Sequence, residues 1–318
     1  MPSFSCTVED SRPGGIRLDR YAAEYLKILS RSQIKAKNLK ARLNGRLVKI
    51  SRILKGGEYL ELSWDEAETC FLVPEELPLE VIYEDERVIV INKSQGMVVH
   101  PGAGNRSGTL ANALLYRKLG KPGVQKPEPF ISDPVFAETC IRPGIVHRLD
   151  KDTSGLIIAA WDWEAHSFLA DQFRARTVRK SYAALVCGCP KNRAGCIDRP
   201  IARSRRDRKT FTVSGREGRR SITWYKLVRS YGNYSLLLVR PRTGRTHQIR
   251  VHLKYLGNPV LGDPIYGSNN PLFKKASLML HAKRLSLVLP GQSGMTTFRT
   301  ALPERFIRFI HGEKAGSF

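Results

Sequence analysis

The stretch at residues 145–155, I-V-H-R-L-D-K-D-T-S-G, constrains this chain most, because it joins a tight turn to an apolar strand. Asp150 lies close behind Arg148 and just before a Thr-Ser-Gly turn signal that ends at Gly155. The apolar residues 156–161 that follow predict a buried strand. A carboxylate presented by a turn at a strand edge is either a reactive group or a residue that hydrogen-bonds its own backbone. This stretch alone leaves both open.

The charge of the chain narrows the choice of partner. The 318 residues carry 53 Lys and Arg against 29 Asp and Glu, a net charge of +24, which predicts a polyanionic partner, nucleic acid before an anionic membrane surface. No apolar run reaches the roughly 18 residues of a membrane-spanning helix. The first ten residues lack the order of a secretory signal, and six scattered cysteines fit reduced thiols. We therefore expect a cytoplasmic protein.

Residues 1–66 are predicted to form a small N-terminal α/β domain. Apolar residues at helical spacing predict a helix over 16–26, and a second, basic helix is predicted over 33–43. Asn44-Gly45 predicts a hairpin that joins residues 40–43 to residues 46–50, and residues 59–63 are typical of a strand.

One-sided charge marks this domain as a surface for phosphates. From Lys27 to Lys55 there are ten basic residues and no acidic one, whereas a merely solvated face normally mixes both signs. The order of elements resembles the αL RNA-binding module of a small-subunit ribosomal protein over residues 14–64, which implies contact with RNA by shape and backbone. The side chains expected to contact RNA are Arg31, Lys35, Lys40 and Arg46. Residues 67–79 are acidic and contain prolines, which predicts a linker.

Residues 80–318 are predicted to form the main domain. Strand patterns dominate and helices are scattered among them, so the expected class is α+β with a mostly antiparallel mixed sheet. The glycines of 102–108 lack the spacing and the acidic residue of a dinucleotide-binding loop. The expected elements are a hairpin at 79–92, helices at 109–119, 163–176, 244–253 and 304–311, strands at 180–187, 221–227, 234–239 and 278–287, an irregular insertion at 120–140 and a basic loop at 199–220.

Four motifs in order carry a second resemblance. They are V-V-H-P-G at 98–102, the H-R-L-D-K-D-T-S-G of 147–155, R-K-S-Y-A-A-L-V at 179–186, and a 24-residue segment at 244–267 that starts G-R-T-H-Q-I-R. In this order they resemble the RluA-type pseudouridine synthases, which isomerise uridine in ribosomal and transfer RNA. The preceding αL module is similar to that of RluC-like and RluD-like members, which act on large-subunit ribosomal RNA. The resemblance implies an isomerase that needs no cofactor.

The resemblance also implies roles for residues of the site. Asp150 would be the catalytic carboxylate, which either attacks C1′ of the ribose or removes the hydrogen at C2′. Arg245, the first arginine of G-R-T-H-Q-I-R, would pair with Asp150 and hold it in place. Tyr182 would stack on the base and take part in removing the C5 proton.

The remaining predicted contacts belong to the flipped nucleotide. A stacked uridine cannot reach an enzymic carboxylate, so the base must be flipped out. The resemblance implies that Arg148 fills the gap that the extruded base leaves in the RNA. Ile249 is expected to pack against the base. His147 is grouped with these substrate contacts by its place in the motif, whereas the residue itself favours a structural hydrogen bond.

Three other functions fit the residues of this chain less well than the isomerase does. A scaffold that only binds RNA would have lost Asp150, Tyr182 or Arg245, and all three are present. A nuclease or glycosidase would need a second placed carboxylate or metal ligands, and the spacing of Cys187, Cys189 and Cys196 does not suit a metal site. We therefore expect no metal and no cofactor. The expected partner is structured RNA, large-subunit ribosomal RNA first and transfer RNA second, bound by a monomer.

Overall fold

The chain folds as two compact units, Met1–Phe71 and Leu72–Phe318, and each is described by itself. The predicted insertion at 120–140 lies outside the described residues except for residue 120, and so do Arg31 and Lys35. The computed structural model describes residues 2–9, 15–26, 28–29, 34, 38–65, 72–102, 104–120, 144–204, 206–207, 210–215, 217–267 and 276–311.

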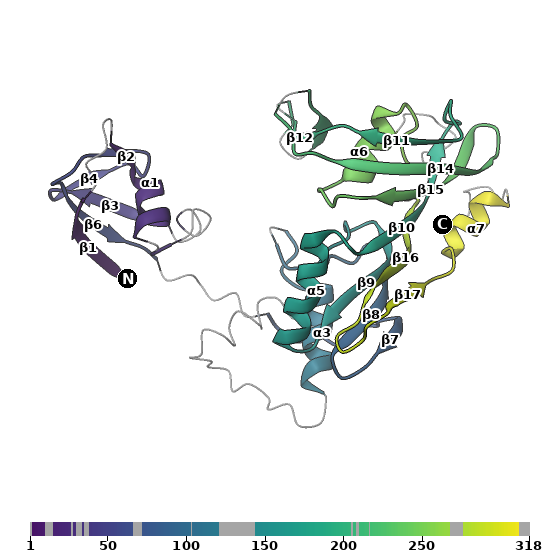
Figure 1. Ribbon diagram of the computed structural model, residues 1–318, viewed down its shortest axis with the longest axis horizontal. Helices are drawn as coiled ribbons and strands as arrows, with labels where there is room; N and C mark the ends of the chain where they lie inside the picture. Colours follow the sequence, from purple (N-terminus) through teal and green to yellow (C-terminus); the bar gives the residue numbers. More distant parts are fainter. Residues whose placement is uncertain are drawn as a thin grey trace. The chain divides into compact units, whose positions relative to one another are not determined.

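A four-stranded antiparallel sheet forms the first unit (Figure 1). Its strands, in spatial order, are β1 (Ser3–Thr7), β6 (Tyr59–Ser63), β3 (Lys40–Leu43) and β4 (Arg46–Val48). The hairpin predicted at Asn44-Gly45 is confirmed, because Leu43 pairs with Arg46 and both turn residues have positive φ, 49° and 79°. Two positive φ values are the mark of the type I′ turn, whose twist matches that of paired strands.

The two helices predicted in this unit are partly wrong. Ile16–Arg17 form strand β2, which pairs with β5 (Ile53–Leu54), so helical structure begins only with α1 (Leu18–Arg20) and continues as a π-helical segment, η1 (Tyr21–Tyr25). The second helix was predicted to reach residue 43, but Lys40–Leu43 is strand β3. Its residues alternate between exposed and buried, which is the period of a strand, and the hairpin outweighs the helical pattern there.

The second unit is built on one large mixed sheet. Neighbouring strands are antiparallel except for β16 and β9, which are parallel. This confirms the predicted α+β class with a mostly antiparallel sheet. The spatial order is β11 (Ala194–Asp198), β14 (Ile222–Ser230), β15 (Tyr234–Pro241), β10 (Arg179–Cys187), β16 (Leu280–Val288), β9 (Ser154–Ala160), β8 (Val88–Lys93) and β7 (Val81–Glu84), with β17 (Met295–Arg299) beside β16.

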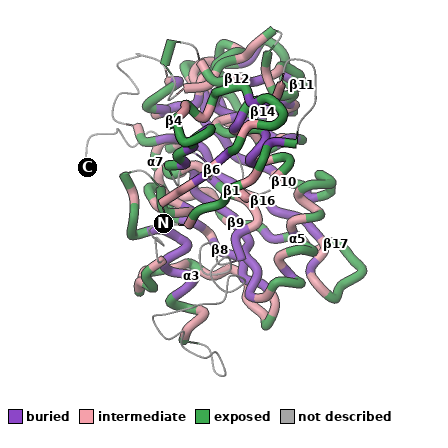
Figure 2. The backbone as a smooth tube through the Cα atoms, turned by 90° about the vertical axis from the view of Figure 1, so that its left-hand side faces the viewer, coloured by how far each residue is buried: buried purple, intermediate pink, exposed green. Residues whose placement is uncertain are grey.

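Strands β8 and β9 are buried on both faces, which explains their continuous apolar sequences (Figure 2). Ile89 and Ile157 point into a core that includes helix α3 (Leu110–Leu119). Their neighbours Val90 and Ile158 point into a second core that includes helix α5 (Trp163–Ala175). The sheet that carries the 145–155 stretch is thus packed on both sides.

Helix α3, in the first of these two cores, begins where the sequence predicts. The Thr109 side chain accepts a hydrogen bond from the Asn112 amide, and the Asn112 side chain accepts one from the Thr109 amide, which together form a capping box. Asn112 also donates to the Val73 carbonyl at 2.8 Å, and the Glu75 carboxylate accepts the Gly108 amide at 3.0 Å. Residues 72–79 of the predicted linker are therefore part of the second unit.

The basic loop predicted at 199–220 contains a small hairpin instead. Strands β12 (Ile201–Arg203) and β13 (Phe211–Val213) pair there. Ile201 packs with Val251 and Tyr266, so this hairpin lies against helix α6 (Gln248–Tyr255). The many basic residues of 199–220 indicated a loop, so the alternating apolar residues that form the two strands were not recognised. The last helix, α7 (Glu304–Ile310), follows the prediction.

Where β9 meets β16, the turn after Asp150 requires a glycine. Gly155 has a φ of +114°, and a Cβ there would lie 2.4 Å from the carbonyl oxygen of Ala282. Ser154 beside it bonds His281 Nδ1 at 2.8 Å and accepts a hydrogen bond from Arg305 at 2.7 Å. The turn that presents Asp150 is therefore fixed by close backbone contact and by a buried polar cluster.

Burial of His281 predicts a pH dependence of stability. Burial, and then the charge of Arg305, lower the pKa of His281 to about 4, well below its value of 6.5 in an unfolded chain. As the pH falls below about 6.5 the unfolded chain takes up the proton first, so stability present above that pH is lost toward pH 4. The loss is about 1.4 kcal/mol per pH unit in this window.

Urea denaturation of the wild type and of His281→Gln at pH 7, 6 and 5 measures this effect. The variant cannot titrate at this position, so its free energy of unfolding should fall less steeply with pH than that of the wild type. Equal slopes for the two proteins would show that His281 does not carry the dependence.

Candidate active site

One pocket of about 420 Å³ in the second unit gathers most of the predicted site residues. Its walls come from the loop before β9, the end of α5, strand β10, the 241–247 loop and the first turn of α6. Among the described residues, Asp150 is the one carboxylate that lines it. The predicted residues that it brings together are His147, Arg148, Asp150, Tyr182, Arg245 and Ile249. Lys40 and Arg46 are exposed on the sheet of the first unit.

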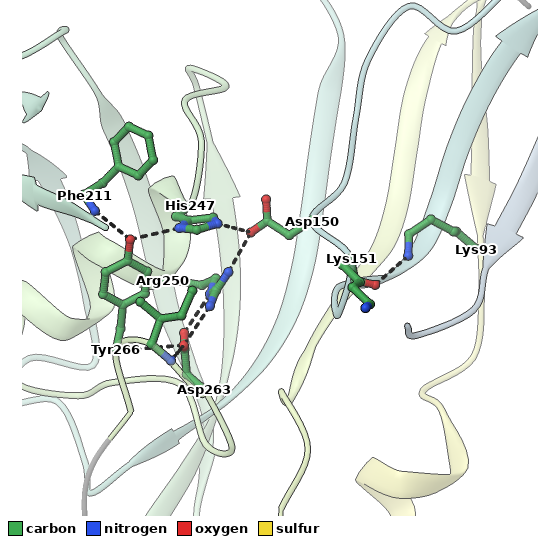
Figure 3. A network of polar contacts seen from close by, with 9 residues as sticks. Lys93, Asp150, Lys151, Phe211, His247, Arg250, Asp263 and Tyr266 are labelled. Carbon is green, nitrogen blue, oxygen red and sulfur yellow. Dashed lines mark hydrogen bonds and ion pairs between the residues drawn. The ribbon is translucent and has the colours of Figure 1, made fainter. Parts of the chain in front are cut away.

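A buried guanidinium holds Asp150. Nη1 of Arg250 donates to Oδ2 of Asp150 at 3.1 Å, and the Arg250 side chain is only 4% exposed. The same guanidinium makes two bonds to Asp263, from Nε at 2.7 Å and from Nη2 at 2.8 Å (Figure 3). This fork leaves Nη1 aimed at Asp150, so Asp263 determines where Arg250 points.

The predicted pairing of Asp150 with Arg245 is wrong. Arg245 lies in the turn before α6, where its amide donates to the Gln248 side chain at 3.0 Å and its Nε donates to the Arg220 carbonyl at 3.5 Å. Helix α6 begins at Gln248, so the second arginine of G-R-T-H-Q-I-R is the one carried on the helix and turned toward Asp150. Arg245 remains part of the pocket wall.

The Arg250–Asp263 pair stays charged although it is buried. Burial acts to raise the pKa of Asp263, but the hydrogen bonds and charge of Arg250 outweigh it and lower that pKa overall. Burial likewise acts to lower the pKa of Arg250, and the bonds and charges of Asp263 and Asp150 raise it overall. Asp263 also accepts the amides of Ile265 and Tyr266, both at 2.9 Å, which fixes the G-D-P-I-Y-G turn.

His247 contacts the same oxygen of Asp150. Its Nε2 lies 3.9 Å from Oδ2, and its Nδ1 lies 2.9 Å from the Tyr266 hydroxyl. That hydroxyl already accepts the Phe211 amide at 2.9 Å, so its own hydrogen is free to bond Nδ1. In this tautomer the Nε2 hydrogen faces Asp150. Burial lowers the pKa of His247 below its ordinary value, against the charge of Asp150.

The other oxygen of Asp150, Oδ1, is not contacted by these two side chains. Arg250 and His247 both contact Oδ2, and Oδ1 points away from them (Figure 3). His247 adopts a left-handed φ of 55° at the start of α6, which is uncommon for a residue other than glycine. Backbone strain of this kind is found at functional sites, where the surrounding bonds hold it.

Tyr182 and Ile249 belong to the apolar part of the pocket wall. Tyr182 is 8% exposed and Ile249 is 6% exposed. Burial, and then the charge of Asp150, raise the pKa of the Tyr182 hydroxyl, so the free protein holds a neutral phenol beside the carboxylate.

His147 makes the structural contact that was its alternative role. Its Nε2 accepts the Ile158 amide at 3.1 Å, and its ring stacks on Phe173. Burial lowers its pKa to about 3, so the imidazole is neutral. His147 lines the pocket, and these two contacts give it a structural role.

Lys93 supports the site from outside the pocket, and no sequence pattern singled it out. Its side chain is 1% exposed, and its Nζ donates to the carbonyls of Ser94, Met97 and Lys151 at 2.8, 2.8 and 3.1 Å. Because Lys151 follows Asp150, this contact helps to fix the turn that presents Asp150 (Figure 3). Burial lowers the pKa of Lys93 to about 8, against the charges of Asp152 and Asp150.

A cation-lined pocket with one clamped carboxylate, set in this mixed sheet, is the site of an enzyme that acts on a polyanion. Within the described residues, no helix is long and apolar enough to cross a bilayer, and no three His, Cys, Asp or Glu side chains gather as metal ligands.

Comparison with known proteins identifies the family. Residues 87–255 match the RNA pseudouridylate synthase family. The chain is 40% identical to the ribosomal large subunit pseudouridine synthase D of Borreliella burgdorferi, over 94% of this chain and 90% of that protein. It is 37% identical to the protein of the same name from Pasteurella multocida, over 95% and 92%. The solved structure of human RNA pseudouridylate synthase domain containing 1 is similar, with a TM-score of 0.56 and 26% identity over 74% of this chain and 87% of that one.

This chain belongs to the RNA pseudouridylate synthase family. It is an isomerase that converts uridine to pseudouridine in RNA.

Proposed function

We propose that this chain forms pseudouridine in large-subunit ribosomal RNA and that Asp150 is the group that reacts with the ribose. The observation that carries the proposal is the contact between Asp150 and the buried Arg250 in a pocket that also contains Tyr182. The choice of RNA is supported by two relatives named as large-subunit enzymes, which match more than nine-tenths of this chain. Transfer RNA is the alternative substrate.

The geometry suits a nucleophile. The target uridine must leave its stack to reach the pocket, at a cost of about a few kcal/mol. Oδ1 of Asp150 then attacks C1′, the bond from C1′ to N1 breaks, and uracil leaves with the bonding electrons. After uracil turns, C5 bonds to C1′, the Asp150 oxygen is released, and the C5 proton is lost while N1 gains one. No atom is gained or lost and no net oxidation occurs, so this scheme calls for no co-substrate.

The other pocket residues are expected to support this reaction in different ways. Arg250 holds the carboxylate in position, and the neutral Tyr182 offers a flat surface for the base and a hydroxyl near it. Ile249 packs on the base, and Arg148 supports the RNA that the base has left. If Asp150 removed the C2′ hydrogen instead, deuterium at C2′ would slow the reaction, and under the nucleophilic scheme it does not.

The first unit is assigned to RNA binding. Lys40, Arg42 and Arg46 are exposed on its hairpin, and the ten basic residues from Lys27 to Lys55 have no acidic residue among them. Phosphate contacts by such a surface give affinity without reading the sequence. Arg31 and Lys35 belong to the same proposal. The protein is proposed to act as a monomer in the cytoplasm.

Pseudouridine mapping tests this function directly. Total RNA from cells with and without this chain is compared, and the purified protein is then incubated with large-subunit ribosomal RNA or transfer RNA in EDTA, without any cofactor. We expect one or a few uridines of large-subunit RNA to depend on the chain in both experiments. Modification of transfer RNA alone would overturn the choice of substrate, and modification of neither RNA would overturn the function.

Replacement of Arg176 by glycine is expected to increase the stability of the protein and to weaken its binding to RNA. Arg176 ends α5 with a left-handed φ of 59°, a position where glycine is preferred, and its side chain lines the pocket. Arg176→Gly should raise the free energy of unfolding by up to about 1 kcal/mol, because a side chain is disfavoured in this conformation. The same change should weaken RNA binding several-fold through the lost cation. Urea denaturation and RNA titration measure the two effects, and Arg176→Lys, which keeps the charge, should bind like the wild type.

A further inference from the structure

Lys180 is a cation in the pocket wall whose charge the protein leaves unmatched. Within the described part of the chain, its Nζ has neither a hydrogen-bond acceptor nor a carboxylate partner, and it lies 5.7 Å from the centroid of the Phe173 ring. Lys180 precedes Tyr182 by two positions on β10, so both side chains leave the same face of the strand. The ammonium therefore faces the space into which Tyr182 also projects.

Comparison with Lys93 shows how unusual this is. Lys93 is 1% exposed and donates to three carbonyl oxygens at 2.8 to 3.1 Å, whereas Lys180 is half-buried and its Nζ has no such acceptor among the described residues. Partial burial of an ammonium without such partners is unfavourable, and it lowers the pKa of Lys180 accordingly. The fold therefore satisfies the charge of Lys93 and leaves that of Lys180 unmatched within the described part of the chain.

The surroundings of Lys180 favour a phosphate over the base. Arg174, Arg176 and Arg242 line the same pocket, so this part of the wall is cationic. A Cβ on Gly244 would lie 3.7 Å from Nζ, so the absence of a side chain there leaves the ammonium open to a ligand. One strand step of two residues, about 7 Å, separates Lys180 from the tyrosine that is assigned to the base.

We propose that Lys180 binds a backbone phosphate next to the uridine whose ribose reaches Asp150. The inference rests on the proposed function, because it places that nucleotide in this pocket. The contact would draw the RNA backbone into the pocket rim and compensate a charge that the free protein leaves unmatched. Lys180 is then a positioning residue for the substrate and takes no part in breaking or forming bonds.

Lys180→Met removes the charge and keeps most of the side chain. The dissociation constant for the substrate RNA is measured over a range of salt concentrations, and the single-turnover rate is measured at saturating RNA. We expect binding to weaken about tenfold and the slope of log affinity against log salt to fall by about 0.7 to 0.9, the value of one phosphate contact. The rate at saturation should stay within about twofold of the wild type, because a uniform binding contact changes affinity and not the chemical step.

Two further variants sharpen the test. Lys226→Met removes an exposed lysine on β14, outside the pocket, and should change neither the affinity nor the slope. Lys180→Arg keeps a cation and should recover most of the affinity. Without RNA, Lys180→Met should melt no lower than the wild type, since it removes a desolvated charge.

The results of these experiments distinguish failure of the Lys180 inference from failure of the proposed function. An unchanged dissociation constant and salt slope in Lys180→Met would overturn the inference, and so would an equal effect of Lys226→Met. A slow single turnover with unchanged affinity would also overturn it, because the ammonium would then act on the departing uracil. Formation of pseudouridine by the wild type is measured first, so failure of the proposed function is seen there, before any variant is compared.

Discussion

Asp150→Asn is expected to lower the rate of pseudouridine formation by more than about 10³-fold and to leave RNA binding within about twofold of the wild type. The amide is nearly the same size as the carboxylate but is a far weaker nucleophile, and it cannot carry the charge that Arg250 and His247 contact. Arg250 keeps both bonds to Asp263, so the pocket should keep its shape. Single-turnover assays on the mapped RNA and a titration with the same RNA measure the two quantities.

Asp152→Asn is the matched control for this loss. Asp152 lies two residues further along the same turn and does not line the pocket. Its neutralisation should leave the rate within a few-fold of the wild type. Asp150→Ala guards against slow deamidation of the new asparagine, which would restore some wild-type enzyme. An active Asp150→Ala protein, or an equal loss in Asp152→Asn, would remove Asp150 from the reaction.

Local sequence patterns were sufficient to predict elements whose conformation depends on a few neighbouring residues. Asn44-Gly45 specifies its hairpin because only a few residues tolerate two positive φ values in succession. The apolar run behind Gly155 specifies a strand because β9 is buried on both faces. At residues 40–43 two local patterns competed, and the pairing of β3 with β4 and β6 decided between them.

The contacts inside the site depend on geometry that no local pattern contains. Arg245 and Arg250 stand in one motif, and which of them meets Asp150 depends on helix α6 starting at Gln248. The role of Lys93 depends on three carbonyls, one of them from a segment 58 positions away along the chain. Motif order could therefore predict which segments meet in the pocket, but it could not assign the ion pairs within it.

Arg250→Leu is expected to combine a large loss of stability with a large loss of activity. The Asp263 side chain is 0% exposed, and without Arg250 its charge keeps only the two amides of Ile265 and Tyr266. Breaking a buried ion pair from one side costs about 3–5 kcal/mol. Asp150 loses its hydrogen-bond donor at the same time, so its aim is lost and the rate should fall by at least about 10²-fold. Urea denaturation and single-turnover assays measure the two losses.

The double variant Arg250→Leu/Asp263→Asn separates the two losses. Asparagine removes the buried charge and still offers its oxygen to both amides, so most of the stability should return. The activity should not return, because Asp150 is still without its guanidinium. Asp263→Asn alone keeps Arg250 and should be far more active than either protein that lacks it.

The dependence of these losses on pH distinguishes an ion pair from simple packing. In Arg250→Leu only the amides of Ile265 and Tyr266 still act against the burial that raises the pKa of Asp263, so its folded-state pKa should rise well above that in the wild type. The deficit in the free energy of unfolding should then be largest at neutral pH and should shrink as the pH falls and Asp263 takes up a proton. A deficit that is the same at pH 7 and pH 5 would mean that lost packing, and not the stranded carboxylate, destabilises the variant. Recovery of activity in the double variant would mean that Arg250 acts on Asp150 only by maintaining the fold.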